Sequence, residues 1–266
     1  MASAHAYNQI LLFGDSITQF SFNPEQKGYG ASLANVYARK SDVLNRGFSG
    51  YNTDWSLPIL RQLLPTKKAQ TEESCSIQLM SIFFGANDAA LPITGQHVPL
   101  DRYKTNLKTM IDLVKDPASD FYNPKMRLIL ITPPPVNEVQ WVEHCKERGE
   151  ELNRFNHLAQ EYAECVVGLG KEVQVPVVNL WSIIMDKVKQ GSDLSEFFVD
   201  GLHLNANGYQ ALYEAIMTVI ASHYKEIHPD QLEVEIPYFR DLINMQEKET
   251  HLQFPLLKQT NSSTEK

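Results

Sequence analysis

An aspartate and a histidine lie three residues apart in the segment VDGLH at positions 199–203. One turn around the glycine can bring the Asp200 carboxylate to the Nδ1–H of the His203 imidazole, which leaves Nε2 free to accept a proton. The alternative explanation is a turn that leads into the next helix and contains an incidental histidine. The spacing predicts His203 as a general base and Asp200 as the residue that orients it.

A serine that could use such a base follows the first apolar run of the chain. This run, Ile10 to Phe13, ends in GDSIT at positions 14–18, where the glycine lets the chain turn sharply. A serine that opens the next segment has an exposed hydroxyl and an amide beside a helix N-terminus, which favours negative charge. An N-cap serine has the same sequence signature, so the pentapeptide taken alone fits both roles. Ser16 is the candidate nucleophile.

Two further loops could donate hydrogen bonds to a developing oxyanion. The segment NRGFSGYNT at positions 45–53 contains two glycines, which allow positive φ and close approach of a backbone amide to a ligand. Asn87, in the segment FGAND at positions 84–88, offers a neutral NH₂ donor where a carboxylate would repel the charge. Each loop considered by itself is more often an ordinary turn.

Short apolar runs that alternate with longer helical patterns must position these four loops. The runs predict strands at 10–13, 42–45, 77–84, 127–131 and 175–180. Apolar residues at helical spacing predict helices over 29–40, 55–64, 103–114, 207–224 and 141–169, the last of which Gly149 could interrupt. This alternation predicts an α/β fold, a three-layer α/β/α sandwich with a mostly parallel sheet and helices on both faces.

The four loops all fall where such a fold would place a site, because doubly wound sheets bind ligands beyond the carboxyl ends of their strands. Together they supply a nucleophile, a base, a residue that orients the base, and donors for an oxyanion. Acyl transfer requires this set of groups.

Other residues near these loops are given structural roles. Asp15 and Asp88 are expected to serve their turns, and Phe20 and Phe22 to be buried in the interior, although they could also line an apolar pocket. The other seven histidines lack this setting and show no metal-ligand spacing, so we expect no metal site.

The four blocks resemble those of the SGNH (GDSL-type) hydrolases and occur in that family's order. GDSIT contains Ser16, NRGFSGY contains Gly50, GAND contains Asn87, and DGLHL contains His203. Longer stretches, such as LLFGDSITQFSF and VLNRGFSGYNT, are similar to the isoamyl acetate-hydrolysing esterase group within the family.

The resemblance implies a five-stranded, flavodoxin-like sheet whose first three strands are neighbours, so that Ser16, Gly50 and Asn87 converge. It also implies a serine esterase that needs no cofactor and acts on small alcohol acetates. In such an enzyme the backbone N–H groups of Ser16 and Gly50 and the side chain of Asn87 would hold the oxyanion.

Composition indicates one folded domain with an acidic surface. The chain has 266 residues, of which 43% are hydrophobic, and a formal net charge of −8, so it can form one sizeable core but repels nucleic-acid phosphates. Residues 1–245 are predicted to form the esterase domain and 246–266 a polar, mobile tail. The segment Pro229 to Leu242 is expected to lie against the body of the fold or against a second copy in a homodimer.

The sequence also favours a cytoplasmic protein without a membrane partner. No lysine or arginine precedes the first apolar run, and no stretch is long enough to span a bilayer. The three cysteines are widely spaced, which fits free thiols in a reducing compartment. A small-molecule ester is the expected partner.

Several other functions remain open at this point. Within the resembled family the substrate could be an acetylated sugar, a lysophospholipid or a thioester. A nucleotide-binding module is weakly supported, because GYGASL at positions 28–33 lacks the third glycine of the dinucleotide fingerprint. A non-catalytic interaction protein on an esterase fold is the remaining alternative. An α/β-hydrolase is disfavoured by the absence of a G-x-S-x-G motif.

Overall fold

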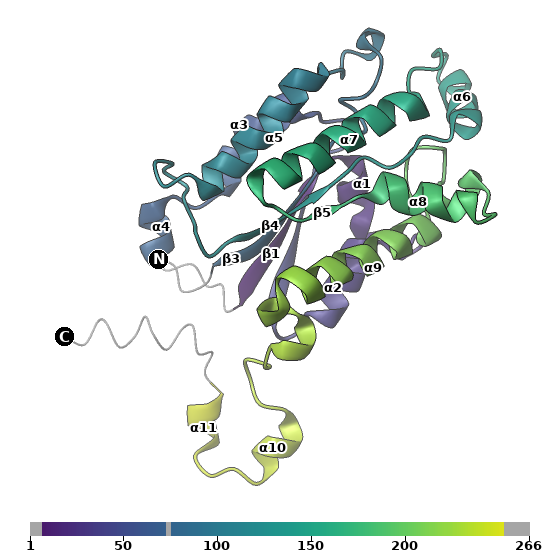
Figure 1. Ribbon diagram of the computed structural model, residues 1–266. Helices are drawn as coiled ribbons and strands as arrows, with labels where there is room; N and C mark the ends of the chain where they lie inside the picture. Colours follow the sequence, from purple (N-terminus) through teal and green to yellow (C-terminus); the bar gives the residue numbers. More distant parts are fainter. Residues whose placement is uncertain (1–6, 73–75, 253–266) are drawn as a thin grey trace.

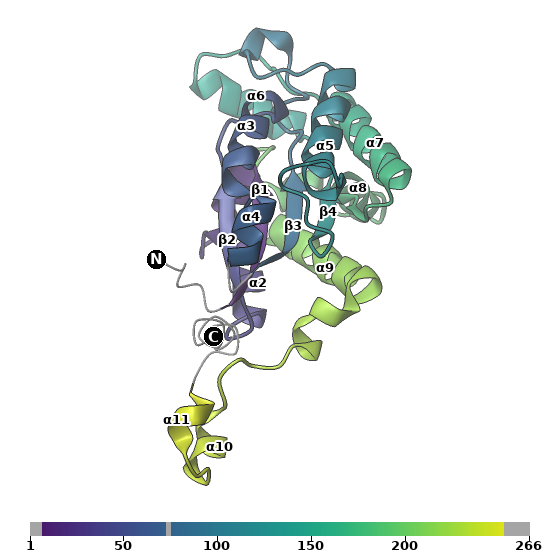
Figure 2. The ribbon, with the colours of Figure 1, turned by 90° about the vertical axis from the view of Figure 1, so that its left-hand side faces the viewer.

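The computed structural model describes residues 7–72 and 76–252. Five parallel strands form one sheet in the order β2-β1-β3-β4-β5 (Figure 1; β2 is labelled in Figure 2). The strands are β1 (Asn8–Gly14), β2 (Ser41–Gly47), β3 (Ile77–Phe83), β4 (Arg127–Ile131) and β5 (Val177–Val178). This order confirms the flavodoxin-like sheet and the prediction that the first three strands are neighbours.

Residues of β1 alternate between two cores, as expected of a strand buried on both faces. Ile10 and Leu12 belong to one buried cluster, and Leu11 and Phe13 belong to the other. Leu128 and Leu130 of β4 lie in the same cluster as Leu11. The sheet therefore separates two apolar layers, which is why its central strands read as continuous apolar runs.

Helices cover both faces of the sheet, as predicted. α2, α8 and α9 contribute to the cluster around Ile10, whereas α3, α5 and α7 contribute to the cluster around Leu11 (Figure 1). The helices are α1 (Ser16–Gln19), α2 (Tyr29–Val36), α3 (Thr53–Leu63), α4 (Lys67–Glu72), α5 (Leu100–Lys115), α6 (Glu138–Glu147), α7 (Asn156–Val173), α8 (Leu180–Lys189), α9 (Ala206–His223), α10 (Phe239–Ile243) and α11 (Lys248–His251).

The helical stretch predicted over 141–169 is two helices. α6 ends at Glu147, shortly before Gly149, and α7 begins at Asn156. The intervening loop lines the cavity described below. The interruption that Gly149 suggested is therefore present, and it is longer than one residue.

Parallel register brings the ends of the first three strands to one edge of the sheet. Gly14, the last residue of β1, is paired with Gly47 at the end of β2 and with Phe83 at the end of β3. Ser16, Gly50 and Asn87 follow these ends by two to four positions. The register therefore places the three loops side by side.

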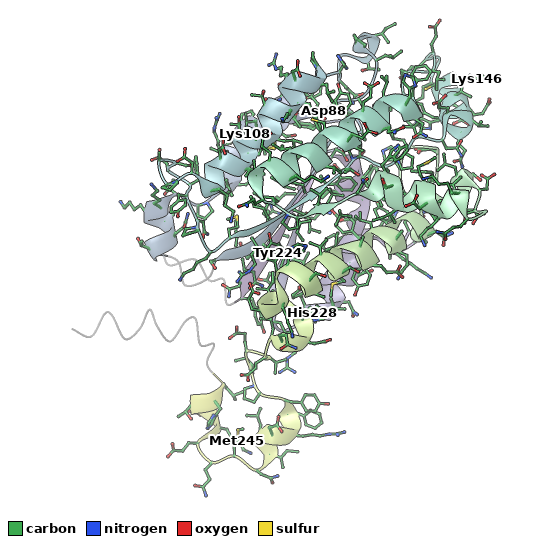
Figure 3. The ribbon with its side chains drawn as sticks, in the orientation of Figure 1. Asp88, Lys108, Lys146, Tyr224, His228 and Met245 are labelled. Carbon is green, nitrogen blue, oxygen red and sulfur yellow. The ribbon has the colours of Figure 1, made fainter. Side chains whose placement is uncertain are left out.

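The segment after α9 begins against the body of the fold and then leaves it. The Arg39 guanidinium donates hydrogen bonds to the carbonyls of Ile236 and Pro237, at 2.5 and 3.1 Å. By contrast, α10 and α11 lie apart from the layers in both views (Figure 1, Figure 2), and Met245 in Figure 3 marks this part. Most of the tail predicted from residue 246, namely 253–266, lies outside the described residues, and the boundary at 245 stays a prediction.

A membrane-crossing helix would have to be longer and more apolar than any helix in the described ranges 7–72 and 76–252.

Candidate active site

Ser16 is the first residue of α1, and only Asp15 separates it from the end of β1. The Asp15 side chain caps this short helix by accepting a hydrogen bond from the backbone N–H of Ile17, at 2.9 Å. The cap residue is thus Asp15, and Ser16 presents its hydroxyl to the cavity instead. Within the described residues the backbone N–H of Ser16 has no hydrogen-bond partner, so it can donate to a ligand.

The Asp200–His203 turn has the geometry that its spacing predicts. The Asp200 carboxylate lies 2.7 Å from Nδ1 of His203 and also accepts hydrogen bonds from the backbone N–H groups of Leu202 and His203. Gly201 has a φ of +96°, which closes the turn. The carboxylate thereby fixes both the backbone and the ring of His203.

His203 in turn reaches across the fold to Ser16. Its Nε2 lies 2.9 Å from the Ser16 Oγ, although the two residues are 187 positions apart. Because the Asp200 carboxylate only accepts hydrogen bonds, it favours the tautomer with the proton on Nδ1, which leaves Nε2 able to accept the serine proton. The three residues predicted from sequence form one continuous hydrogen-bonded chain.

The hydrogen bonds around Asp200 favour the ionised form of its carboxyl group. Burial by itself would raise the pKa of this carboxyl, but hydrogen bonds from the His203 ring and from the turn outweigh it and hold the pKa at about 2. Asp200 is therefore ionised at neutral pH and can stabilise a positive charge on the imidazole.

Gly50 and Asn87 face the same cavity as Ser16 and His203, which has a volume of about 860 Å³. Gly50 has a φ of +80°, and within the described residues its backbone N–H has no hydrogen-bond partner. Asn87 is buried, and its Nδ2 donates one hydrogen bond to the Tyr51 carbonyl at 2.9 Å, which leaves its second N–H free. All the predicted site residues are thus brought together.

Arg154 also lines this cavity, and no sequence pattern singled it out. The side chain is only 6% exposed and lies in the loop between α6 and α7. Its guanidinium donates to Oδ1 of Asn87 and to Oε1 of Gln96, at 2.9 and 2.7 Å, and lies 4.9 Å from the centre of the Trp141 ring. A lone arginine in a loop has no spacing that marks it as buried, so the sequence carried no signal for it.

Asp15 serves its own turn, as predicted, whereas Asp88 holds the first residue of α3. The Asp88 carboxylate accepts hydrogen bonds from the backbone N–H and the hydroxyl of Thr53, at 2.9 and 2.6 Å, and Figure 3 labels it in the body of the fold. Burial raises the pKa of Asp15 to about 6 and that of Asp88 to about 7.

The prediction that Phe20 and Phe22 are buried is wrong. They are 40% and 36% exposed, because the short turn after α1 places them at the surface. The Phe20 ring lies 5.6 Å from the His203 ring, approximately edge to face. Phe20 thus borders the site.

The side chains that commonly bind metals are dispersed over the fold. Across residues 7–72 and 76–252, no three His, Cys, Asp or Glu side chains are grouped so that they could hold a metal ion. Among the histidines outside the site, His97 has its Nδ1 3.1 Å from the Asp88 carbonyl oxygen.

Comparisons with known proteins identify one family and several named esterases that are similar to the chain. Residues 12–211 match the sequence model of the GDSL-like lipase/acylhydrolase family. The human isoamyl acetate-hydrolyzing esterase 1 homolog is 42% identical over 243 residues, which cover 90% of each chain. The isoamyl acetate-hydrolyzing esterase of Saccharomyces cerevisiae is 33% identical over 250 residues, or 90% of this chain and 96% of the yeast protein.

A solved structure supports the same grouping. The crystal structure of the lipase/acylhydrolase from Enterococcus faecalis superimposes with a TM-score of 0.58 and 25% sequence identity, and the match covers 86% of this chain and 100% of the bacterial one.

Proposed function

The chain belongs to the GDSL-like lipase/acylhydrolase family, and we propose that it is a serine esterase that hydrolyses small alcohol acetates with Ser16 as nucleophile. His203 serves as the general base and Asp200 orients it. The oxyanion is held by the backbone N–H groups of Ser16 and Gly50 and by the Asn87 side chain.

One observation carries this assignment. The hydrogen-bonded chain from Asp200 through His203 to Ser16, with contacts of 2.7 and 2.9 Å, opens into the cavity that Gly50 and Asn87 also line. A purely structural serine would not need a base within hydrogen-bond distance at a cavity.

The geometry supports a two-step acyl transfer. His203 Nε2 takes the hydroxyl proton as Ser16 Oγ attacks the ester carbonyl, and the Asp200 carboxylate stabilises the resulting imidazolium. His203 then gives this proton to the departing alcohol, which leaves an acyl group on Ser16. Water attacks the acyl group, His203 accepts the proton of the water, and the acid departs as Ser16 regains its hydrogen.

Support for acetates of small alcohols comes from the named activity of the yeast relative and of the mammalian homologues. The cavity bears Trp55 and Ile93 as apolar groups and Glu150 and Arg148 as charged ones. Deacetylase, lysophospholipase and thioesterase activities differ from this proposal in the acyl chain or in the leaving group.

A panel of p-nitrophenyl acetate, butyrate and octanoate, together with isoamyl acetate, tests the proposal. We expect kcat/KM to be highest for the acetates, and the Ser16→Ala variant, which keeps the fold, to reduce hydrolysis to the background rate. Octanoate as the best substrate would contradict the acetate preference. Turnover retained in Ser16→Ala would remove Ser16 from its role.

We also propose that two copies associate through the segment around α10. Tyr238, Phe239 and Ile243 are 46%, 56% and 62% exposed there, so several large apolar side chains are exposed within one short segment. Light scattering over a range of concentrations should give the mass of a dimer. A monomer mass at every concentration would contradict the proposal.

A cytoplasmic location is the remaining proposal. It is supported by the wide spacing of the three cysteines, which fits free thiols in a reducing compartment. Fluorescence of a tagged full-length chain in the cytosol would agree with it, whereas export into the medium would not.

A further inference from the structure

Arg154 is a buried cation whose hydrogen bonds go to neutral oxygen atoms. Its guanidinium donates to Oδ1 of Asn87, to Oε1 of Gln96, to the carbonyl of Ala86 and to Oδ1 of Asn153, at distances between 2.7 and 3.2 Å. None of these acceptors is a carboxylate, so the charge has no direct ion pair and is offset only from farther away, by the charges of Asp15 and Glu150. Burial lowers the pKa of Arg154 to about 10, which still leaves it protonated at neutral pH.

Burial of this charge costs free energy, because neutral acceptors only partly offset the desolvation of a guanidinium. Apolar side chains of similar volume often give equal or greater stability than buried charges, so stability alone does not account for Arg154. Beside the cavity, Arg154 contacts two other side chains that line it, Asn87 and Gln96.

The first contact sets the orientation of the Asn87 amide. Oδ1 of Asn87 accepts from Arg154 at 2.9 Å and from Nε2 of Gln96 at 3.2 Å, so this atom must be the oxygen. Nδ2 of Asn87 is then the atom that can donate toward an oxyanion. Donation from a cation to Oδ1 also polarises the amide and makes its N–H a stronger donor.

The second contact extends to the other loop. Gln96 accepts from Arg154 through Oε1, and its Nε2 donates to the Gly50 carbonyl at 2.9 Å. The backbone carbonyl of Gln96 accepts from Nδ2 of Asn52, two residues after Gly50, at 2.8 Å. One guanidinium is therefore connected to two of the three proposed oxyanion donors, directly to Asn87 and through Gln96 to the Gly50 loop.

We propose that Arg154 is a positioning residue for the oxyanion hole: it fixes and polarises the Asn87 amide directly and holds the Gly50 loop through Gln96. This role rests on the proposed function, since it strengthens donors that act only when negative charge develops on the substrate oxygen. It predicts an effect on kcat rather than on KM, because an interaction realised only in the transition state does not alter ground-state binding.

The test compares Arg154→Met and Arg154→Lys in p-nitrophenyl acetate hydrolysis, with Arg127→Met as the matched control. Arg127 pairs with Glu226 at the start of β4, away from the site, so its loss should leave kcat unchanged. For Arg154→Met we expect kcat to fall about 10- to 100-fold with KM nearly unchanged, somewhat less than the loss of a whole oxyanion donor. Arg154→Lys, which keeps the charge but not the planar fork, should restore part of the loss.

A double-mutant cycle separates positioning from a general effect on the fold. In an Asn87→Ala background Arg154→Met should lower kcat by less than about threefold, because the group through which it chiefly acts is gone. An equal loss in both backgrounds, a loss confined to KM, or a kcat within twofold of the parent would each overturn the proposal.

Two further measurements keep the result decisive. If thermal unfolding shows that Arg154→Met does not fold, Gln96→Leu replaces it. This variant removes the bridge between Arg154 and the Gly50 loop and should lower kcat several-fold with KM unchanged. An unaltered kcat would overturn the proposal.

The parent enzyme and Ser16→Ala are assayed in parallel. Parental turnover that does not depend on Ser16 refutes the proposed function itself, a different failure from that of Arg154.

Discussion

Three aspartates adjoin the proposed catalytic residues, and their surroundings affect the charged form in different ways. Asp200 is stabilised as an anion by the His203 ring and by two backbone N–H groups, and its pKa is about 2. Burial dominates at Asp15 and Asp88, where it raises the pKa to about 6 and about 7. Each of these two carboxyls also has one buried oxygen without a hydrogen-bond partner in the described structure. The same residue type is thus a stable anion in one turn and a weak acid in the other two.

Replacing Asp200 by asparagine should retain the turn and lose the reaction. The amide oxygen can still accept from the backbone N–H of His203, but the NH₂ group would face Nδ1 and favour the tautomer with the proton on Nε2. We expect kcat at neutral pH to fall by about 10⁴, the loss seen when the triad aspartate of a serine protease becomes asparagine. Steady-state kinetics and thermal unfolding would check this, and a kcat within tenfold of the parent would contradict the orienting role.

Asp88 should make the protein less stable as pH rises toward neutrality. Its pKa is about 7 in the folded protein against an ordinary value of 3.8, so between these values the folded protein keeps a proton that the unfolded chain has lost. The free energy of unfolding therefore decreases as the pH rises through this window. In Asp88→Asn, which preserves the acceptor for Thr53, this free energy should fall less between pH 4 and 7.

Urea unfolding across the same pH window measures the difference between Asp88→Asn and the parent. The exposed Asp101→Asn on α5 is the control for removing a negative charge, and it should follow the parental pH dependence. The same pH dependence in Asp88→Asn as in the parent would show that Asp88 does not titrate in this range.

Among the elements of the fold, the start of α6 packs against the turn that carries Asp200 and His203 and holds it in place. The backbone N–H of Asn137, the residue before α6, donates to the Gly201 carbonyl at 2.9 Å. A Cβ at position 201 would lie 2.5 Å from the Asn137 carbonyl oxygen. The glycine therefore meets two requirements, a positive φ and close approach to a neighbouring backbone.

Gly201→Ala should accordingly reduce both stability and activity. Backbone strain of this kind costs about 1–3 kcal/mol, and the clash with α6 should add to it and displace the His203 ring from Ser16. Gly191→Ala is a matched control, since Gly191 has a φ of +111° with no atom within 4 Å of the added Cβ. We expect both variants to unfold at a lower temperature, and only Gly201→Ala to lose kcat. Equal kcat in the two variants would show that contact with α6 does not position the base.

At the scale of the whole molecule, the sheet and three of the four loops could be predicted because their motifs follow the ends of β1, β2 and β3, whereas α8 separates the Asp200–His203 turn from β5. The order of apolar runs and the family resemblance then fixed which loops meet. Ser16, Asn87 and His203 were accessible in this way, since their neighbours along the chain identify them.

Features that depend on contacts between distant loops could not be predicted. Arg154 contacts Asn87 across 67 positions, and nothing beside it in the sequence indicates burial. Its loop was hidden within a helical pattern that continues on both sides, from α6 to α7. Phe20 was misassigned for a related reason, because an aromatic residue beside a site and one in a core look alike in sequence.

Two buried tyrosines connect distant parts of the chain through their hydroxyl groups. The Tyr209 hydroxyl on α9 donates to the carbonyl of Ile17 in α1 at 2.8 Å. The Tyr37 hydroxyl donates to the carbonyl of Ile227 at 2.9 Å. Both side chains are almost fully buried, but only the first bond connects the helix after His203 to the helix that carries Ser16.

Removing either hydroxyl should cost about 1–3 kcal/mol of the free energy of unfolding, because each leaves a buried carbonyl with one partner fewer. Denaturant unfolding of Tyr209→Phe and Tyr37→Phe would measure these costs. We expect kcat to fall several-fold only in Tyr209→Phe, since α1 then loses a bond that helps to keep Ser16 within reach of His203. If both variants lose stability equally and retain the parental kcat, the strand ends and the Asp15 cap suffice to position Ser16 without the bond from α9.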